Sequence, residues 1–182
     1  MDVLPRGFVL VGCRDEAMLR AVLSFRAGFL TSISATTPEL AFSRFRRCPT
    51  AFCCVTDPAG ELHGYFILLP LTSTAVEKIR SGAVTAGRHI LDEDLADGAG
   101  PLPGAYLSVV CATTWLARAA TVAGIVVRLR RLCAERDLRR LFVRAATEEG
   151  ARVAARLTER AIAADGRIHE IDLTQFARTS EW

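Results

Sequence analysis

The sequence predicts an α/β domain with a mixed central sheet, largely antiparallel at first and parallel afterwards, flanked by helices. Three observations predict this class. A strand-like run at residues 8–11 precedes two helical patterns, Pro58 and Gly60 mark a turn between two apolar runs, and strands alternate with helices from Tyr106 onwards. A chain of 182 residues has the usual length of one domain, so we expect residues 1–182 to form a single domain.

Composition narrows the class of protein further. Hydrophobic residues make up 51% of the chain and charged residues 24%, which excludes a disordered or fibrous protein. The 23 basic and 20 acidic residues balance too evenly to indicate nucleic acid, and no apolar run approaches the roughly 18 residues of a membrane span. Six irregularly placed Cys indicate reduced thiols. We therefore predict a cytoplasmic protein without a nucleic-acid or membrane partner.

The first quarter of the chain predicts one strand and two helices. The strand covers residues 7–12, and the apolar run before Cys13 is too short for the lipoprotein signal that it superficially resembles. Apolar residues then recur at helical spacing over residues 19–30. A second helix starts with Thr37 as N-cap and Pro38 at its first position.

A β-hairpin follows. Residues 51–56 and 61–69 are strand-like, and the Asp-Pro-Ala-Gly sequence at residues 57–60 is typical of a turn. The second strand ends in a continuous apolar run, as expected when both faces are covered. We expect residues 70–103 to be an irregular insertion or surface loop, with one short helix over residues 72–80.

From Tyr106 onwards the pattern alternates regularly, and each strand–helix–strand unit predicts a right-handed parallel crossover. The predicted elements are a strand at 106–112, an amphipathic helix beginning near Ala120 and reaching Cys133, a strand at 138–145, a helix capped by Thr147 and reaching Ala161, a strand at 168–173 and a polar tail at 174–182.

This order of elements resembles the GNAT superfamily of acyl-CoA N-acyltransferases over roughly residues 7–173, which implies a GNAT-like α/β fold. The family's phosphate-binding loop reads Arg or Gln, two residues, Gly, any residue, then Gly or Ala. Residues 118–123 match it at Arg118 and Ala123 and depart from it at Thr121, which stands in place of the central Gly.

Further departures concern the end of the chain. The family often carries Asn, Ala and Tyr along the shorter helix that follows the long helix and the next strand, and these places fall on Thr147, Gly150 and Ala154. The Tyr that often acts as general acid is therefore absent. The family also usually ends in two strands, of which the sequence indicates one.

The resemblance implies that acetyl-CoA or CoA is a co-substrate, with its pyrophosphate at the N–H groups that open the helix and its pantetheine arm along the preceding strand. The residues it assigns to the cofactor are Val109, Val110, Cys111, Arg118, Ala119, Ala120, Thr121, Val122 and Ala123. The plain alternative is that residues 118–123 are only a helix entry and residues 109–111 only core strand.

Two functions from different classes follow. The first is an acyl-CoA-dependent N-acyltransferase, expected to move an acetyl group to an unidentified amine by direct attack in a ternary complex. The second is a catalytically inactive GNAT-like domain that binds CoA or another protein. A homodimer joined through a C-terminal sheet edge is a third, weaker idea.

No catalytic residue can be named from the sequence. His63, Tyr65, Tyr106 and Ser108 lie on the strands facing the presumed cleft, but strand parity is not fixed. The His and Cys residues show no metal-ligand spacing, so no metal is expected. Cys111 and Cys133 lie in apolar stripes typical of buried, inert thiols. Arginines at positions 128, 130, 131, 136, 139 and 140 are typical of a solvated helix face, because acidic residues interrupt them and aromatic residues are lacking.

Overall fold

The fold is known from a computed structural model that describes residues 2–27, 36–145, 148, 152, 160–161 and 167–174. These residues fall into two compact units. The first comprises Met1–Leu68 and Val109–Arg128, and the second comprises Leu69–Ser108 and Leu129–Trp182. The described strands are hydrogen-bonded in the order β1-β2-β3-β4-β5-β6-β8-β7. Most of the predicted helix after Thr147 lies outside the described residues, although its described residues Glu148 and Arg152 are helical, and the predicted tail lies outside them from residue 175.

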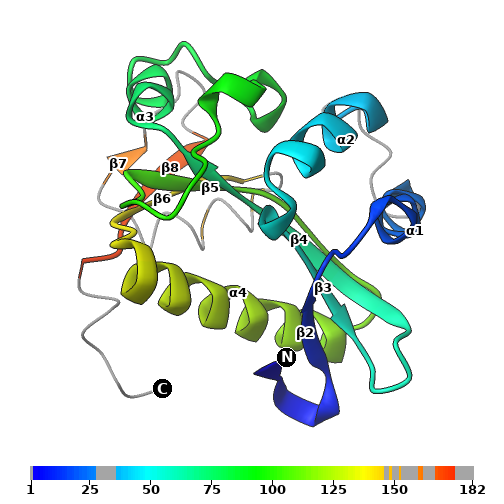
Figure 1. The fold of residues 1–182 in the computed structure, drawn as a ribbon. Helices are drawn as coiled ribbons and strands as arrows, with labels where there is room; N and C mark the ends of the chain where they lie inside the picture. Colours follow the sequence, from blue (N-terminus) through cyan, green and yellow to red (C-terminus); the bar gives the residue numbers. More distant parts are fainter. Residues whose placement is uncertain are drawn as a thin grey trace. The chain divides into compact units, whose positions relative to one another are not determined.

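The strands of the first unit are antiparallel (Figure 1). They are β1 (Asp2–Val3), β2 (Val9–Gly12), β3 (Phe52–Thr56) and β4 (Leu62–Leu71), with short 3-10 turns η1 (Pro5–Gly7) and η2 (Pro49–Ala51) before β2 and β3. Val11 pairs with Cys54, which pairs in turn with Tyr65. Strand β2 was predicted from the sequence, whereas the two-residue strand β1 is too short to show alternation and was not.

Two helices of this unit begin at side-chain caps. Asp15 accepts a hydrogen bond from the Met18 N–H at 2.8 Å, just before α1 (Glu16–Ala27). Thr37 accepts one from the Leu40 N–H at 3.3 Å at the start of α2 (Pro38–Arg47), as predicted. Each cap satisfies one of the N–H groups that a helix leaves free at its start.

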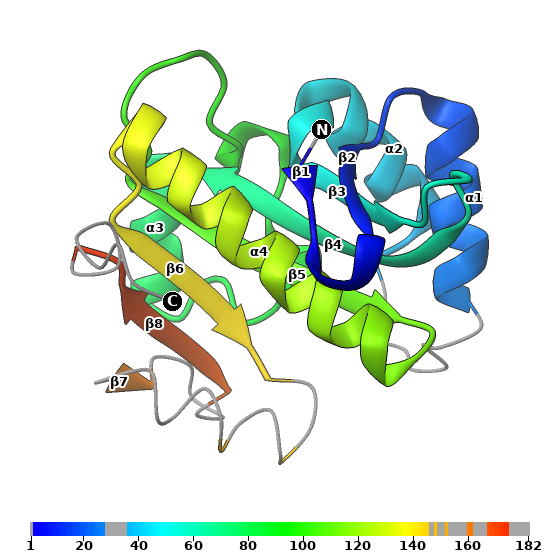
Figure 2. The ribbon, with the colours of Figure 1, turned by 90° about the horizontal axis from the view of Figure 1, so that it is seen from below.

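Helices cover both faces of β2–β4 (Figures 1 and 2). On one face the ring of Tyr65 packs edge-on against Phe25 of α1, with ring centroids 6.1 Å apart. On the other face lies α4 (Trp115–Arg136), whose Gly124 packs against Phe66. The neighbours Tyr65 and Phe66 thus point to opposite helical layers, which explains why β4 is apolar on both faces.

The predicted hairpin is confirmed. The Asp57 side chain accepts a hydrogen bond from the Glu61 N–H at 2.8 Å, and Gly60 adopts a φ of 90°, which favours glycine. Strands β3 and β4 pair directly on either side of this turn.

The second unit combines a parallel and an antiparallel strand pair. Its helix is α3 (Ser73–Arg80), its 3-10 turns are η3 (Gly87–His89) and η4 (Asp92–Asp94), and its strands are β5 (Gly104–Ala112), which continues into the first unit, β6 (Arg140–Arg144), β7 (Arg160–Ala161) and β8 (Ile168–Asp172). Strand β6 is parallel to β5, with Tyr106 opposite Phe142, as the crossover rule predicted.

The second predicted parallel crossover is wrong, because β8 is antiparallel to β6, with Leu141 opposite Ile171. The chain forms β7 before it reaches β8, and this extra strand reverses its direction. Ala161, expected in the buried stripe of a helix, lies in β7 instead. The described chain therefore ends in two strands rather than the one indicated by the sequence.

Residues 70–103 are more ordered than a surface loop. The predicted helix is present as α3, with the Thr72 side chain accepting a hydrogen bond from the Ala75 N–H. The Lys78 ammonium then lies 2.7 Å from the buried carboxylate of Asp94 in η4. Core residues also come from this segment, and they include Ile79, Val84, Ile90, Leu95 and Leu102.

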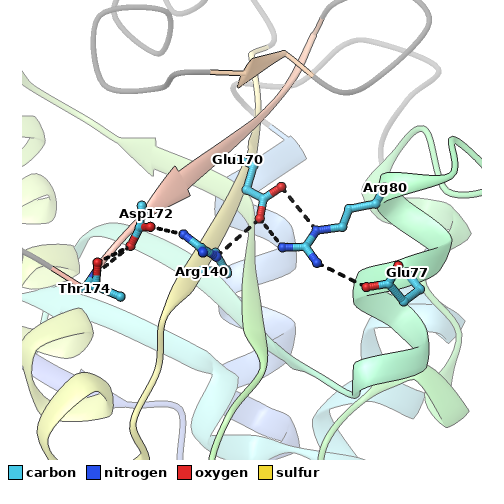
Figure 3. Close-up of polar contacts among 6 residues, drawn as sticks. All are labelled: Glu77, Arg80, Arg140, Glu170, Asp172 and Thr174. Atoms are coloured by element: carbon cyan, nitrogen blue, oxygen red, sulfur yellow. Dashed lines mark hydrogen bonds and ion pairs between the residues drawn. The ribbon is translucent and has the colours of Figure 1, made fainter.

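Ion pairs join α3 to strands β6 and β8 (Figure 3). Glu170 accepts from Arg80 at 2.5 Å and also lies 3.5 Å from Arg140. Arg140 pairs in addition with Asp172, which accepts from Thr174. Basic and acidic side chains therefore alternate from Arg80 of α3 through Glu170 and Arg140 to Asp172, and these ion pairs connect α3 to the two strands.

Among the described residues, no helix is both long and apolar enough to cross a bilayer.

Candidate cofactor site

The end of β5 carries three of the residues that the resemblance assigns to the cofactor. Val110 is exposed, Val109 is half-buried and Cys111 is buried. The carbonyl oxygen of Cys111 lies against Gly64 of β4. These residues are thus part of a packed strand, and their pairing with a pantetheine arm stays a prediction.

Helix α4 begins earlier than expected. Thr114 is its N-cap, because its side-chain oxygen accepts a hydrogen bond from the Ala117 N–H at 3.1 Å. The Thr114 carbonyl accepts another from the Arg118 N–H at 2.9 Å, so the helical pattern is already established there. The expectation that residues 118–123 form a loop before a helix that begins near Ala120 is therefore wrong.

Local chemistry explains the early start. Thr114 is a good N-cap, and the eight residues from Trp115 to Val122 contain neither Gly nor Pro to interrupt a helix. Thr121 replaces the glycine that would have let the backbone leave the helical conformation. The Thr-Thr pair at residues 113–114 is the sequence signal for this helix start, but the match of residues 118–123 to the loop motif favoured a later one.

Inside α4, the six residues differ in what they offer a ligand. Ala120 and Thr121 are buried, and the Thr121 hydroxyl donates to the Ala117 carbonyl at 2.7 Å. That hydroxyl is therefore engaged and hidden, and it does not fit a phosphate-binding role. Arg118, Ala119 and Val122 are exposed and Ala123 is half-buried.

The exposed start of α4 does fit an anion. The first N–H groups of a helix have no intrahelical acceptor, and they carry the positive end of the helix dipole. Thr113, Thr114 and Trp115 are exposed there, and Arg118 lies one turn further along. The Arg6 guanidinium stands 5.4 Å from the centre of the Trp115 ring. The donor set is thus backbone N–H groups and two guanidinium groups, which suits a diphosphate.

This turn is also fixed to β4. The Thr113 N–H and the Thr113 hydroxyl both donate to the carbonyl of His63, at 2.9 and 3.2 Å. The strand therefore sets the position at which α4 starts. Sequence reasoning found Arg118 but missed Arg6, because the nearness of Arg6 to α4 depends on tertiary structure.

The four polar strand residues have different surroundings. Tyr65 and Tyr106 are buried, with 1% of each side chain exposed, whereas His63 and Ser108 are half-buried. Tyr65 packs on Phe25, as described above, in the first unit, and Tyr106 belongs to the second unit. No general acid or base is assigned from these positions.

All six cysteines are free of disulfides, and Cys111 and Cys133 are buried as predicted. Burial raises the pKa of the Cys133 thiol, which disfavours the reactive thiolate. The hydrogen bond between Cys13 and Cys54, and then burial, raise the pKa of Cys54 well above its usual value. Only Cys48 of the six is half-exposed. The same Cys13–Cys54 hydrogen bond lowers the pKa of Cys13, but that thiol is buried.

The arginines near the end of α4 contact the protein itself. Several of them bind oxygen atoms elsewhere in the chain. These pairs are Arg128 with the Thr50 carbonyl, Arg136 with the Gly100 carbonyl, Arg139 with Asp137 and Arg140 with Asp172. Such contacts account for the basic residues without a nucleic-acid partner, whose absence stays a prediction.

Known proteins match this chain in structure but not in sequence. No protein-family model matches the chain, and no curated protein matches it by sequence. A GNAT-family acetyltransferase from Listeria monocytogenes is similar with a TM-score of 0.56 and 12% identity, over 91% of this chain and 95% of that one. The GNAT-like decarboxylase GphF, in complex with isobutyryl-CoA, is similar with a TM-score of 0.55 and 10% identity. The match covers 81% of this chain and 71% of GphF's chain.

The loading GNATL domain of CurA from Lyngbya majuscula is similar with a TM-score of 0.53 and 10% identity. The match covers 76% of this chain, which spans 64% of that domain's length. At such low identities these likenesses establish a shared fold.

Proposed function

Because the chain has the GNAT fold, we propose that it binds acyl-CoA at the start of α4 and is an N-acyltransferase, with acetyl-CoA as the donor and an amine as the acceptor. The observation that carries the proposal is the exposed, electropositive start of α4 directly after β5. Thr114 caps the helix there, and Arg6 and Arg118 add two positive charges.

The parts of this site differ in what they would do. The N–H groups of Thr114, Trp115 and Leu116 would donate to the diphosphate, and Arg118 would add a charge-assisted hydrogen bond. The edge of β5 at residues 109–111 would align the pantetheine arm. When bound, acyl-CoA supplies an acyl thioester that an amine can attack. The fully packed Thr121 has no part in holding it.

A second function, a GNAT-like domain that binds a ligand or protein without catalysis, is favoured by one specific observation. Helix α4 runs unbroken through residues 118–123, where the family's motif has a glycine-containing loop. A helix leaves no free N–H groups in its interior, so fewer donors remain for the diphosphate than a loop would offer.

Two measurements separate these functions. We expect CoA to raise the melting temperature, because a ligand at about 100 times its Kd adds about 2.7 kcal/mol to stability. We also expect thiol release when acetyl-CoA is incubated with a panel of primary amines. Binding without thiol release from any amine favours the non-catalytic function. No shift at millimolar CoA contradicts both the proposed cofactor and the site.

Arg118→Glu tests the site itself. Replacing a guanidinium by a carboxylate beside a diphosphate should weaken CoA binding by about tenfold, which corresponds to about 1.4 kcal/mol. Arg88→Glu is the matched control, because it makes the same charge change on an exposed residue of η3. Equal Kd values for CoA in the two variants would remove Arg118 from the site.

A further inference from the structure

Three metal-binding side chains converge on the β3–β4 hairpin, outside the proposed cofactor site. They are Asp57 and Glu61, on either side of the turn, and His63 at the start of β4. One ligand atom from each lies within 4.8 Å of the other two. Asp57 and His63 are half-buried and Glu61 is exposed, so the group is open to solvent on one side.

The spacing of these atoms suits a shared cation better than a direct hydrogen bond. Nε2 of His63 lies 3.6 Å from Oδ2 of Asp57, which is beyond the usual range of a hydrogen bond. Two ligands on one tetrahedral zinc ion, with bonds of about 2.0–2.2 Å, are about 3.3–3.6 Å apart. The observed separation therefore matches the edge of such a coordination shell.

Contacts within the hairpin and from neighbouring segments fix two of the three ligands, Asp57 and His63. Oδ1 of Asp57 accepts the Glu61 N–H at 2.8 Å, which leaves Oδ2 facing His63. The His63 backbone is fixed by Thr113 through the two hydrogen bonds to its carbonyl. Its ring packs edge-on against Phe8, with ring centroids 5.5 Å apart and the planes at 73°. Such packing lowers the entropy that ordering the ligands would otherwise cost.

We propose that Asp57, Glu61 and His63 bind a divalent cation of the zinc class. An imidazole nitrogen with two carboxylate oxygens is a donor set that Zn²⁺ accepts, whereas Mg²⁺ and Ca²⁺ prefer oxygen ligands throughout. Three protein ligands leave a coordination position for water. The spacing of the Cys and His residues predicted no metal, because the two carboxylates join His63 only through the turn.

Calorimetry on the chelator-treated protein tests the site. We expect one Zn²⁺ to bind per chain, and Mg²⁺ to give no binding heat. His63→Gln and Glu61→Gln should each weaken Zn²⁺ binding at least tenfold. The Glu61 side chain is exposed, so its replacement leaves the fold intact, and circular dichroism and the melting temperature check this for both variants.

Two controls address other ligands for zinc. His89→Gln changes another half-buried His, on η3, and Cys48→Ser removes the half-exposed thiol. Both should bind Zn²⁺ like the unaltered protein. The cobalt-substituted protein should also lack thiolate charge-transfer absorption. The proposal is overturned by no Zn²⁺ binding, by unchanged binding in His63→Gln, by loss of binding in either control, or by a thiolate band.

Discussion

Gly64 on β4 and Thr121 on α4 lie so close together that residue 64 has no room for a side chain. A Cβ atom built there would stand less than 3.0 Å from the Thr121 hydroxyl and 3.0 Å from the Cys111 carbonyl. The hydroxyl is held by its bond to the Ala117 carbonyl. Strand, helix and side chains therefore fill the region in which the family's motif has its glycine.

This close approach predicts that Gly64→Ala destabilises the protein. Overpacking a rigid contact costs about 1–3 kcal/mol, and Thr121 is β-branched and bonded, so it cannot easily move. Adding Thr121→Ala should restore part of the loss, because it removes the atom that clashes. Adding Thr121→Ser, which keeps the hydroxyl, should restore less. Urea unfolding of the single and double variants gives the coupling energy between residues 64 and 121. If the losses of the two single variants simply add in the double variant, the two residues do not clash and the packing described is contradicted.

The capping hydrogen bond at the start of α4 gives a second prediction. Thr114→Ala removes the acceptor for the Ala117 N–H and should lower the free energy of unfolding by about 1 kcal/mol. Thr114→Ser keeps an acceptor oxygen and should be close to neutral. The midpoints of chemical denaturation of the two variants are compared with that of the unaltered protein. Equal losses in both variants would mean that the cap does not stabilise the helix.

Asp94 provides a third prediction, because its carboxylate is buried and has two partners. One oxygen accepts from Lys78 at 2.7 Å and the other from the Leu91 N–H at 2.9 Å. Asp94→Ala removes both contacts and should cost about 2–4 kcal/mol. Asp94→Asn keeps an acceptor for Leu91 and should cost about half as much. Denaturation curves would contradict this account if Asn were as damaging as Ala.

The ion pairs on β8 give a prediction about acid. Hydrogen bonds from the Thr174 hydroxyl and N–H, and then from Arg140, lower the pKa of Asp172 to about 2 (Figure 3). An unfolded Asp has a pKa of about 3.9, so the folded protein binds this proton less readily. The stabilisation is therefore complete above about pH 4 and is lost as the pH falls towards 2.

Asp172→Asn removes this titrating group and should flatten the loss of stability between pH 4 and pH 2. Thr174→Val removes the hydroxyl but keeps the N–H, so it should have a smaller effect in the same direction. The measurement is the free energy of unfolding of each variant and of the unaltered protein from pH 5 to pH 2. An equally steep loss in Asp172→Asn and in the unaltered protein would contradict the prediction. The energy involved is small, because Asp172 is half-exposed and solvent screens it.

Local chemistry made much of the fold predictable. The Thr37 and Thr72 caps and the Asp57 turn rest on contacts between residues four or fewer positions apart, and the sequence displays them directly. The parallel β5–β6 pair follows from the long helix between the two strands, because a helical connection returns the chain to begin the next strand in the same direction. By contrast, the direction of β8 depends on β7, whose two residues are too few to show a pattern.

The candidate site was predictable only in part, for a different reason. The match at Arg118 and Ala123 favoured a loop, while the Thr114 cap favoured a helix, and the capping signal proved correct. Arg6 reaches the start of α4 from a segment that the sequence cannot place beside it, and the bond from Thr113 to the His63 carbonyl also forms only in the folded protein. The same holds for His63, whose carboxylate partners meet it only once the hairpin has formed.

The burial of the thiols has a practical consequence. Five of the six cysteines are buried, and Cys48, at the end of α2, is half-exposed. A maleimide fluorophore should therefore attach to the folded protein at one place, without mutagenesis. Its label would sit beside the turn that leads into β3, where it could report ligand-induced movement by energy transfer or anisotropy.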